Sequence, residues 1–181
     1  MIATSAGRQE GASPLRKCRE SDIEFDFSNA LQVFEHDTTS SKCEGDSIAD
    51  GNTVWSGVDF RVKDNAGWIW IEVKNWRKGK SDYLSKLKSK PFAERMRAKF
   101  LGTTAFLAWN GSFNIAPLHY FLLFEPHQRA DPSLNAPFQD LIRSELPIPN
   151  RLDIKVFVMN VSKWNETYPE YPAKKTKQTN I

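Results

Sequence analysis

The strictest alternation of hydrophobic and polar residues in this chain lies between Ser56 and Trp76. Two alternating segments flank Asp64-Asn65-Ala66-Gly67, in which Asn and Gly accept the positive φ angles of tight turns. This pattern predicts a β-hairpin. One face of the hairpin is apolar and contributes to a hydrophobic core; it consists of Val58, Phe60, Val62, Ile69, Ile71 and Val73.

The opposite face of the predicted hairpin collects charged side chains. We place Lys63 opposite Trp68 across the turn. Continued along the strands, this register makes Asp59 and Glu72 cross-strand neighbours. Because side chains alternate along a strand, Lys74 projects from the same side as Glu72. Two carboxylates and an ammonium group therefore share one face.

A second periodic segment begins at Glu20. Its apolar residues recur at three- and four-residue spacing, which is typical of an amphipathic helix. Ser21 is a suitable N-cap, and Glu24 completes a capping box three residues later. We therefore predict a helix of about four turns that ends near His36. Its apolar positions are Ile23, Phe27, Ala30, Leu31 and Phe34.

The remaining segments predict alternating helices and strands. Asp82 to Leu101 predicts one or two helices interrupted at Pro91, and Thr104 to Trp109 fits either a helix end or a buried strand. The later elements are a strand over Leu118–Glu125, a helix near 135–146 and a strand over Asp153–Val161. This order predicts an α/β (α+β) fold of three layers, in which helices flank a mixed β-sheet.

Length and composition favour one globular domain. The chain has 181 residues, of which 40% are hydrophobic and 12% aromatic. We expect a flexible arm over residues 1–18, a globular domain over 19–166 and a mobile basic tail over 167–181. No run approaches the roughly 18 apolar residues of a membrane span, and no apolar signal segment is visible. We therefore expect a cytoplasmic protein without membrane contact, in which Cys18 and Cys43 are reduced and hold no metal.

The formal net charge of +3 is unevenly distributed along the chain. Between Lys74 and Lys99 there are ten Lys or Arg residues and two acids, so this block carries +8 and the remainder −5. A basic block directly after the paired carboxylates favours an anionic partner, and we expect DNA. The alternative is a lysine-rich, solvated loop and helix face.

The paired carboxylates predict a metal site. Two acids held side by side repel each other unless a positive charge lies between them. Mg²⁺ meets that need, because it takes carboxylate, water and phosphate oxygens as ligands. We therefore predict Mg²⁺ at Asp59 and Glu72, with the Val73 carbonyl as a further ligand. Lys74 is placed to pair with the carboxylates, hold an attacking water or face a phosphate.

Asp59 and the tripeptide Glu72-Val73-Lys74 resemble the motif of the PD-(D/E)XK nuclease superfamily, with twelve residues between the two parts. Val58 stands where the family name has proline. The resemblance implies a restriction-endonuclease-like fold and an endonuclease that hydrolyses DNA phosphodiester bonds with a metal-activated water. It also implies Mg²⁺ as the cofactor, with Mn²⁺ as a substitute.

The same resemblance implies further contributors to the site. An acid from the N-terminal helix is expected, and of Glu20 and Glu24 we favour Glu24 as the catalytic one. The helix after the Glu-x-Lys strand is expected to present a basic residue, for which Lys99 and Arg95 are the candidates. The remaining candidate substrate contacts lie in the basic loop after the hairpin and are Trp76, Arg77 and Lys78.

Three other interpretations of the motif are open. The charged face is an ordinary solvated surface of an amphipathic hairpin, or the domain is an inactive nuclease-like module that binds nucleic acid or a protein partner. A carboxylate-pair hydrolase acting on sugars is the third, although the +8 block suits an anionic substrate better. If the protein cuts both strands of a duplex, a symmetric homodimer is favoured.

Overall fold

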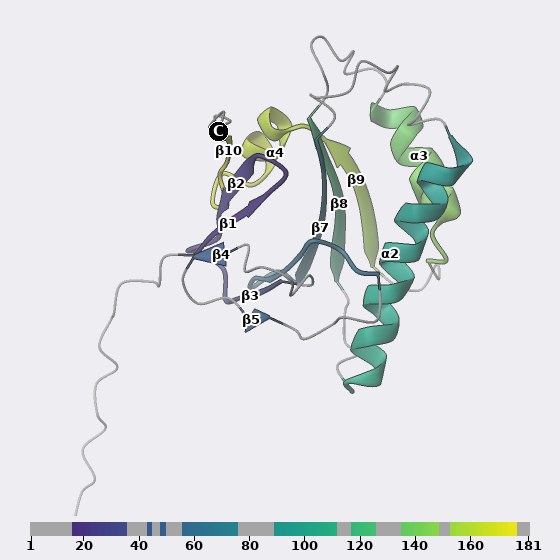
Figure 1. The fold of residues 1–181 in the computed structure, drawn as a ribbon, viewed down its shortest axis with the longest axis horizontal. Coiled ribbons are helices and arrows are strands. Elements are labelled where there is room, and N and C mark those ends of the chain that lie inside the picture. The colour runs from purple at the N-terminus through teal and green to yellow at the C-terminus, as the bar shows by residue number, and fades with distance from the viewer. Residues whose placement is uncertain are drawn as a thin grey trace, which may run out of the picture.

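The protein folds in three layers (Figure 1). The computed structural model describes residues 16–35, 43–44, 48–49, 56–75, 89–111, 117–125, 135–148 and 153–176. A central sheet carries helices α2 (Lys90–Trp109) and α3 (Asn135–Glu145) on one face. A smaller sheet and helix α4 (Val161–Thr167) cover the other face. The predicted mixed α/β architecture is confirmed.

The central sheet has six strands in the order β5-β3-β6-β7-β8-β9. Strands β3, β6 and β7 are antiparallel neighbours, whereas β7, β8 and β9 are parallel, so the sheet is mixed as predicted. The strands are β5 (Ile48–Ala49), β3 (Gln32–Glu35), β6 (Phe60–Lys63), β7 (Trp68–Asn75), β8 (Leu118–Glu125) and β9 (Ile154–Met159).

The predicted hairpin and its register are confirmed in β6 and β7. Lys63 pairs with Trp68, and the ladder runs away from the turn to the pair Phe60 and Ile71, which directly adjoins Asp59 and Glu72 in the sequence. The turn is closed by Asp64, whose Oδ1 accepts hydrogen bonds from two backbone N–H groups of the turn. The apolar face lies in the core between the two sheets, except for Val58, which packs under α2.

The connection from β7 to β8 runs through helix α2. Pro91 occupies its first turn and does not interrupt it, because a proline there has no intrahelical hydrogen bond to lose. The helix is continuous to Trp109, so the segment 104–109, which fitted either a helix end or a buried strand, is helical. Residues 82–88 lie outside the described part of the chain. The later strand, helix and strand are confirmed as β8, α3 and β9.

The predicted N-terminal helix is wrong. Residues 17–35 form β1 (Lys17–Glu20), β2 (Ile23–Asp26) and β3. Ser21 and Asp22 connect β1 to β2 with φ angles of 51° and 66°, the positive values of a tight hairpin turn. The alternating residues Ile23 and Phe25 bury one face of β2 against the central sheet. This burial in the tertiary structure stabilises a strand here, although the residue spacing also fits a helix.

The smaller sheet contradicts the expected flexible arm and mobile tail where the structure describes them. Its order is β10-β2-β1-β4, with β4 (Cys43–Glu44) and β10 (Ala173–Lys175) at the edges. Residues 16–18 therefore belong to the fold. In the segment 168–176, Tyr168 and Tyr171 are buried, and the Tyr171 carbonyl accepts a hydrogen bond from the Trp164 indole at 2.6 Å.

The two cysteines lie on neighbouring strands of the smaller sheet. Cys18 is buried and disulfide-bonded, and its register partner across β1 and β4 is Cys43, the only other cysteine. The expectation of reduced thiols is therefore wrong.

Among the helices that the structure describes, none is both long and apolar enough to cross a membrane.

Candidate functional site

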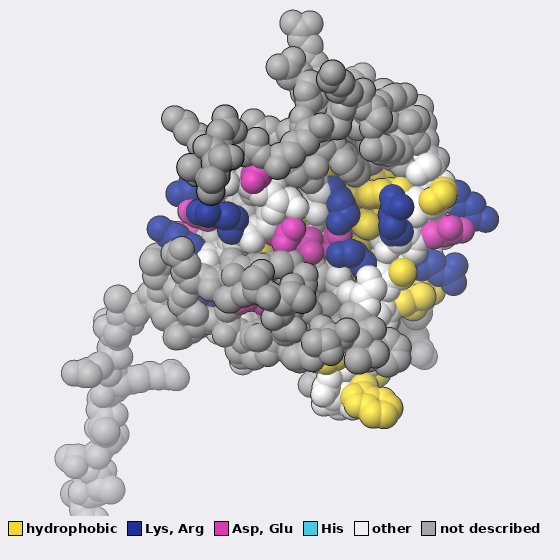
Figure 2. Space-filling view, in the orientation of Figure 1, with side chains coloured by type: hydrophobic (Ala, Val, Ile, Leu, Met, Phe, Trp, Pro, Cys, Tyr) yellow, Lys and Arg dark blue, Asp and Glu magenta, His cyan; other side chains and the backbone are white. Residues whose placement is uncertain are grey.

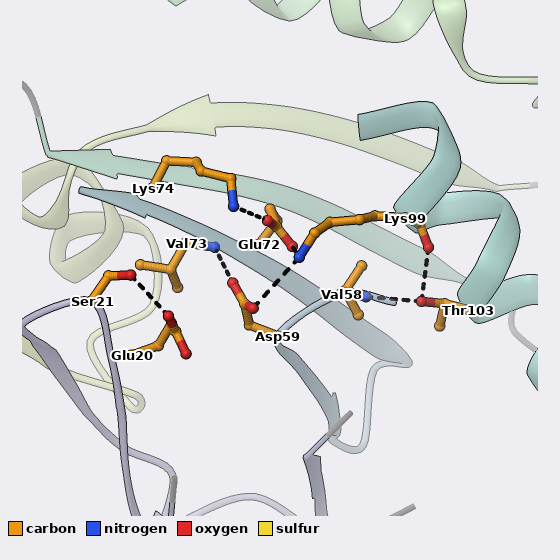
Figure 3. Close-up of polar contacts among 9 residues, drawn as sticks. All are labelled: Glu20, Ser21, Val58, Asp59, Glu72, Val73, Lys74, Lys99 and Thr103. Carbon is orange, nitrogen blue, oxygen red and sulfur yellow. Dashed lines mark hydrogen bonds and ion pairs between the residues drawn. The ribbon is translucent and has the colours of Figure 1, made fainter. Parts of the chain in front are cut away.

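Two buried carboxylates lie next to each other on the face of the central sheet beneath α2 (Figure 3). Glu72 in β7 is 0% exposed, and Asp59, directly before β6, is 8% exposed. The Asp59 Oδ2 atom accepts a hydrogen bond from the Val73 N–H at 2.8 Å, which holds the carboxylate against β7. This burial excludes the interpretation of a solvated hairpin face.

Two ammonium groups contact these acids. Lys74, which shares a face of β7 with Glu72, bonds to the Glu72 Oε1 atom. Lys99 reaches the pair from α2, with its Nζ atom 2.8 Å from Glu72 Oε2 and 3.7 Å from Asp59 Oδ1. The structure thus brings together Asp59, Glu72, Lys74 and Lys99, as predicted, and their formal charges sum to zero.

Close backbone contact fixes the position of α2 over the acids. The Thr103 hydroxyl donates to the Lys99 carbonyl and accepts from the Val58 N–H, both at 3.0 Å. At Gly102 the helix lies so near the chain that a Cβ atom would stand 1.8 Å from the Ser56 carbonyl oxygen. The segment that leads into Asp59 and the helix that carries Lys99 are therefore joined directly.

A third acid, Glu20, approaches the pair from the smaller sheet. Glu20 and Cys18 share one face of β1 because strand side chains alternate. Cys18 is buried between the sheets, so Glu20 emerges at the edge of that core, beside Asp59 and Val73 in Figure 3. The Ser21 hydroxyl donates to Glu20 at 2.8 Å. Of the two N-terminal acids that the sequence suggested, Glu20 is the one near the site.

The structure does not bring Glu24, the favoured catalytic acid, to the carboxylate pair. Glu24 lies on the opposite face of the smaller sheet, because its neighbours Ile23 and Phe25 turn inward. Its carboxylate bonds to Lys174 at 2.8 Å and to Arg19 at 2.7 Å. Hydrogen bonds from these two cations lower the pKa of Glu24, which therefore serves as a surface ion-pair partner.

Burial and neighbouring charge shift the proton affinities at the site. Burial, followed by repulsion from Asp59, raises the pKa of Glu72 to about 7, against the opposing effect of Lys99 and Lys74. For Lys99, burial favours the neutral amine, but attraction to Glu72, Asp59 and Glu20 outweighs it and raises the pKa. The acids therefore hold Lys99 charged. A neutral Glu72 is accessible near neutral pH.

The raised pKa of Glu72 predicts a pH dependence of stability. Folding raises this pKa from 4.5 to about 7, so the native state holds a proton that the unfolded chain has lost, and ionising Glu72 destabilises the fold across that window. We expect the free energy of unfolding of the wild type, minus that of Glu72→Gln, to fall by about 3 kcal/mol from about pH 4.5 to about pH 8. Urea unfolding of both proteins measures this difference, and a pH-independent difference would contradict it.

The predicted substrate contacts are partly described. Arg95 is exposed on α2, one turn before Lys99, and its guanidinium lies 5.7 Å from the centre of the Phe92 ring. Figure 2 shows Asp and Glu side chains in the middle of one face, with Lys and Arg on both sides, over α2 and over the smaller sheet. Trp76, Arg77 and Lys78 lie outside the described residues.

Three features of the site are not predicted by the sequence pattern. These are the contact at Gly102, the double hydrogen bond of the Thr103 hydroxyl and the buried Tyr120. Burial, with Glu72 and Asp59 nearby, raises the pKa of Tyr120 far above its usual value. A glycine and a threonine within an amphipathic helix are the only visible hints in the sequence.

Comparison with known proteins adds no family to this description. No family model matches the sequence, and searches of curated proteins and of solved structures find no match either. Within the described ranges, no group of three or more His, Cys, Asp or Glu side chains is arranged to hold a metal ion. The residues of the site are therefore the basis for inferring a function.

Proposed function

We propose that this protein is a divalent-metal-dependent deoxyribonuclease, an endonuclease that hydrolyses DNA phosphodiester bonds. One observation carries the proposal: Asp59 and Glu72 are buried side by side at neighbouring strands and direct carboxylate oxygens toward a common cation position. Burial of two neighbouring like charges is costly, and a site for a polyvalent cation would account for it.

The arrangement of the strands supports a restriction-endonuclease-like fold. The acids lie on an antiparallel hairpin, and the next helix, α2, leads to β8, which is parallel to β7. A mixed sheet with a helix beside the Glu-x-Lys strand is what resemblance to the PD-(D/E)XK superfamily implies. In this chain the smaller sheet occupies the position at which we expected an N-terminal helix, with Glu20 as its acid near the site.

The residues fit a hard divalent cation. Asp59 and Glu72 would hold Mg²⁺ or Mn²⁺ through oxygen, with the Val73 carbonyl as a further ligand. One oxygen of each acid already faces the same ammonium, that of Lys99, and this supports a position at which the pair shares a cation. When bound, the metal would polarise the scissile phosphate and lower the pKa of a water molecule.

The basic residues of the chain complete the proposed mechanism. Lys74, held by Glu72, orients the attacking water or stabilises negative charge that develops on the phosphate. Arg95, exposed on α2 one turn before Lys99, binds substrate phosphate, and the basic sequence directly after β7 keeps Trp76, Arg77 and Lys78 as candidate substrate contacts. Cleavage of both strands of a duplex favours a symmetric homodimer.

Incubation with supercoiled plasmid tests the proposal. We expect the wild type to relax or linearise the plasmid with Mg²⁺ or Mn²⁺. It should be inactive with EDTA, because the role proposed for Asp59 and Glu72 is to hold the metal ion. Lys74→Ala is expected to lower the rate about a hundredfold. Lys163→Ala is a suitable control, since Lys163 is exposed on α4 and paired with Glu166. Equal cleavage by the wild type and Lys74→Ala would reject this site.

The two lysines also support a second candidate function. Lys74 and Lys99 neutralise the acids without metal, so a module that binds nucleic acid or a protein partner without turnover has a stable site as well. Calorimetric titration with Mn²⁺ separates the two candidates. Absence of Mn²⁺ binding to a folded wild type favours the non-catalytic module.

A further inference from the structure

Lys99 stands at the point where the two buried acids converge (Figure 3). The remaining oxygen of each acid is held elsewhere, that of Asp59 by the Val73 N–H and that of Glu72 by Lys74. The other oxygen of each acid, Asp59 Oδ1 and Glu72 Oε2, faces the Lys99 ammonium, at 3.7 and 2.8 Å. Lys99 therefore fills the position that a shared cation would take.

The charges at the site favour either the Lys99 ammonium or a metal ion at this position, but not both together. Asp59 and Glu72 against the two ammonium groups paired with them, Lys74 and Lys99, give a formal charge of zero, to which the more distant Glu20 adds a negative charge that acts on Lys99. A divalent cation placed beside both ammonium groups would meet like-charge repulsion in a poorly solvated site. Metal entry is therefore much easier if one ammonium leaves.

Lys99 is the ammonium whose departure would vacate the position shared by both acids, because Lys74 is bonded to the other oxygen of Glu72, Oε1. Its backbone is fixed, because its carbonyl accepts a hydrogen bond from Thr103 and α2 is packed on the sheet. Its side chain has four rotatable carbon–carbon bonds and is 22% exposed, so the charged end can swing outward while the helix stays in place. Exposed Arg95 lies one turn away, on the same side of α2, where phosphate is proposed to bind.

We propose that Lys99 is an internal counter-cation that is exchanged for the metal when nucleic acid binds. A backbone phosphate gives the Lys99 ammonium a new partner, and the vacated oxygens of Asp59 and Glu72 accept the metal. Metal and DNA consequently bind with positive coupling, and by linkage each raises the affinity of the other by the same factor. Lys99 is thus a positioning residue that weakens metal binding before substrate is present. This inference rests on the proposed function.

Calorimetric titration with Mn²⁺ tests the exchange without measuring cleavage. Wild type and Lys99→Met are titrated alone and with a saturating, cleavage-resistant phosphorothioate DNA duplex. We expect Lys99→Met alone to bind Mn²⁺ about tenfold more tightly than the wild type alone. The duplex is expected to tighten Mn²⁺ binding to the wild type by about tenfold and to have little effect on Lys99→Met.

Lys90→Met is the matched control, because Lys90 lies on the same helix, is 78% exposed and pairs only loosely with Glu94 at 3.9 Å. It is expected to behave as the wild type. If the duplex leaves Mn²⁺ binding to the wild type unchanged, the exchange is overturned whether or not the variant folds. If Lys99→Met and the wild type bind Mn²⁺ with equal affinity, the proposed exchange of Lys99 for the metal is wrong, whereas the proposed metal site is supported. If neither folded protein binds Mn²⁺, the proposed function fails with it.

Discussion

Replacing Asp59 by asparagine is expected to lower the rate of Mg²⁺-dependent plasmid cleavage by about a thousandfold. Asparagine keeps a side-chain oxygen that accepts the hydrogen bond from the Val73 N–H, which is 2.8 Å long in the wild type. The substitution removes the negative charge that the metal needs and retains the contact between the strands. Initial rates of supercoil loss, together with a thermal unfolding curve, measure activity and fold in the same preparation.

Asp153→Asn provides the control for this substitution. Asp153 is 63% exposed before β9 and lies 4.0 Å from Lys155, a weak surface pair. Its variant is expected to cleave as the wild type does. Cleavage by Asp59→Asn at the wild-type rate would show that this carboxylate has no part in the reaction.

Replacing Gly102 by alanine is expected to lower the free energy of unfolding by more than the roughly 1–3 kcal/mol typical of an overpacked core. A Cβ atom at this position would stand 1.8 Å from the Ser56 carbonyl oxygen and 2.9 Å from its carbon. Both neighbours are backbone atoms, so no side-chain rotation can relieve the clash. The helix must shift away from the segment that leads into Asp59, and Mn²⁺ binding should weaken together with stability.

Gly111→Ala separates steric clash from conformational strain. Gly111 follows the end of α2 with a φ angle of 68°, and a Cβ there would meet nothing within 4 Å. We expect a loss of about 1 kcal/mol from the left-handed backbone alone, without a change in Mn²⁺ binding. Urea unfolding and calorimetry of both variants make the comparison. Equal destabilisation of the two would contradict the proposed contact between α2 and Ser56.

The central hairpin was predictable because its determinants are local. The turn residues Asp64 to Gly67 and the strict alternation on either side specify both the turn and the register, and a slip by one residue would expose the whole apolar face. That register places Asp59 next to Glu72. The same holds for β8 and α3, whose lengths and periods match a single type of element.

The N-terminal segment was not predictable from its periodicity. Ile23 and Phe27 fit a helical spacing of four, but together with Phe25 they fit an alternating spacing of two equally well. Strand β2 is stabilised by partners distant in the sequence, β10 and the buried Trp164 among them. This error also misplaced the acid. The chain turns between β1 and β2, so Glu20 pairs with the inward-facing Ile23, whereas Glu24 lies on the opposite face of the smaller sheet, and of the two acids Glu20 is the one near the site.

By itself, the sequence determined the strands that carry Asp59, Glu72 and Lys74, and their adjacency, since turn chemistry and side-chain alternation act over a few residues. Only the tertiary structure decided that these acids are buried, that Glu20 approaches them and that Lys99 lies between them. Those contacts depend on how α2 and the smaller sheet pack against the central sheet. Packing of this kind is governed by shape and by buried backbone contacts such as that of Gly102, which no local pattern of residues reveals.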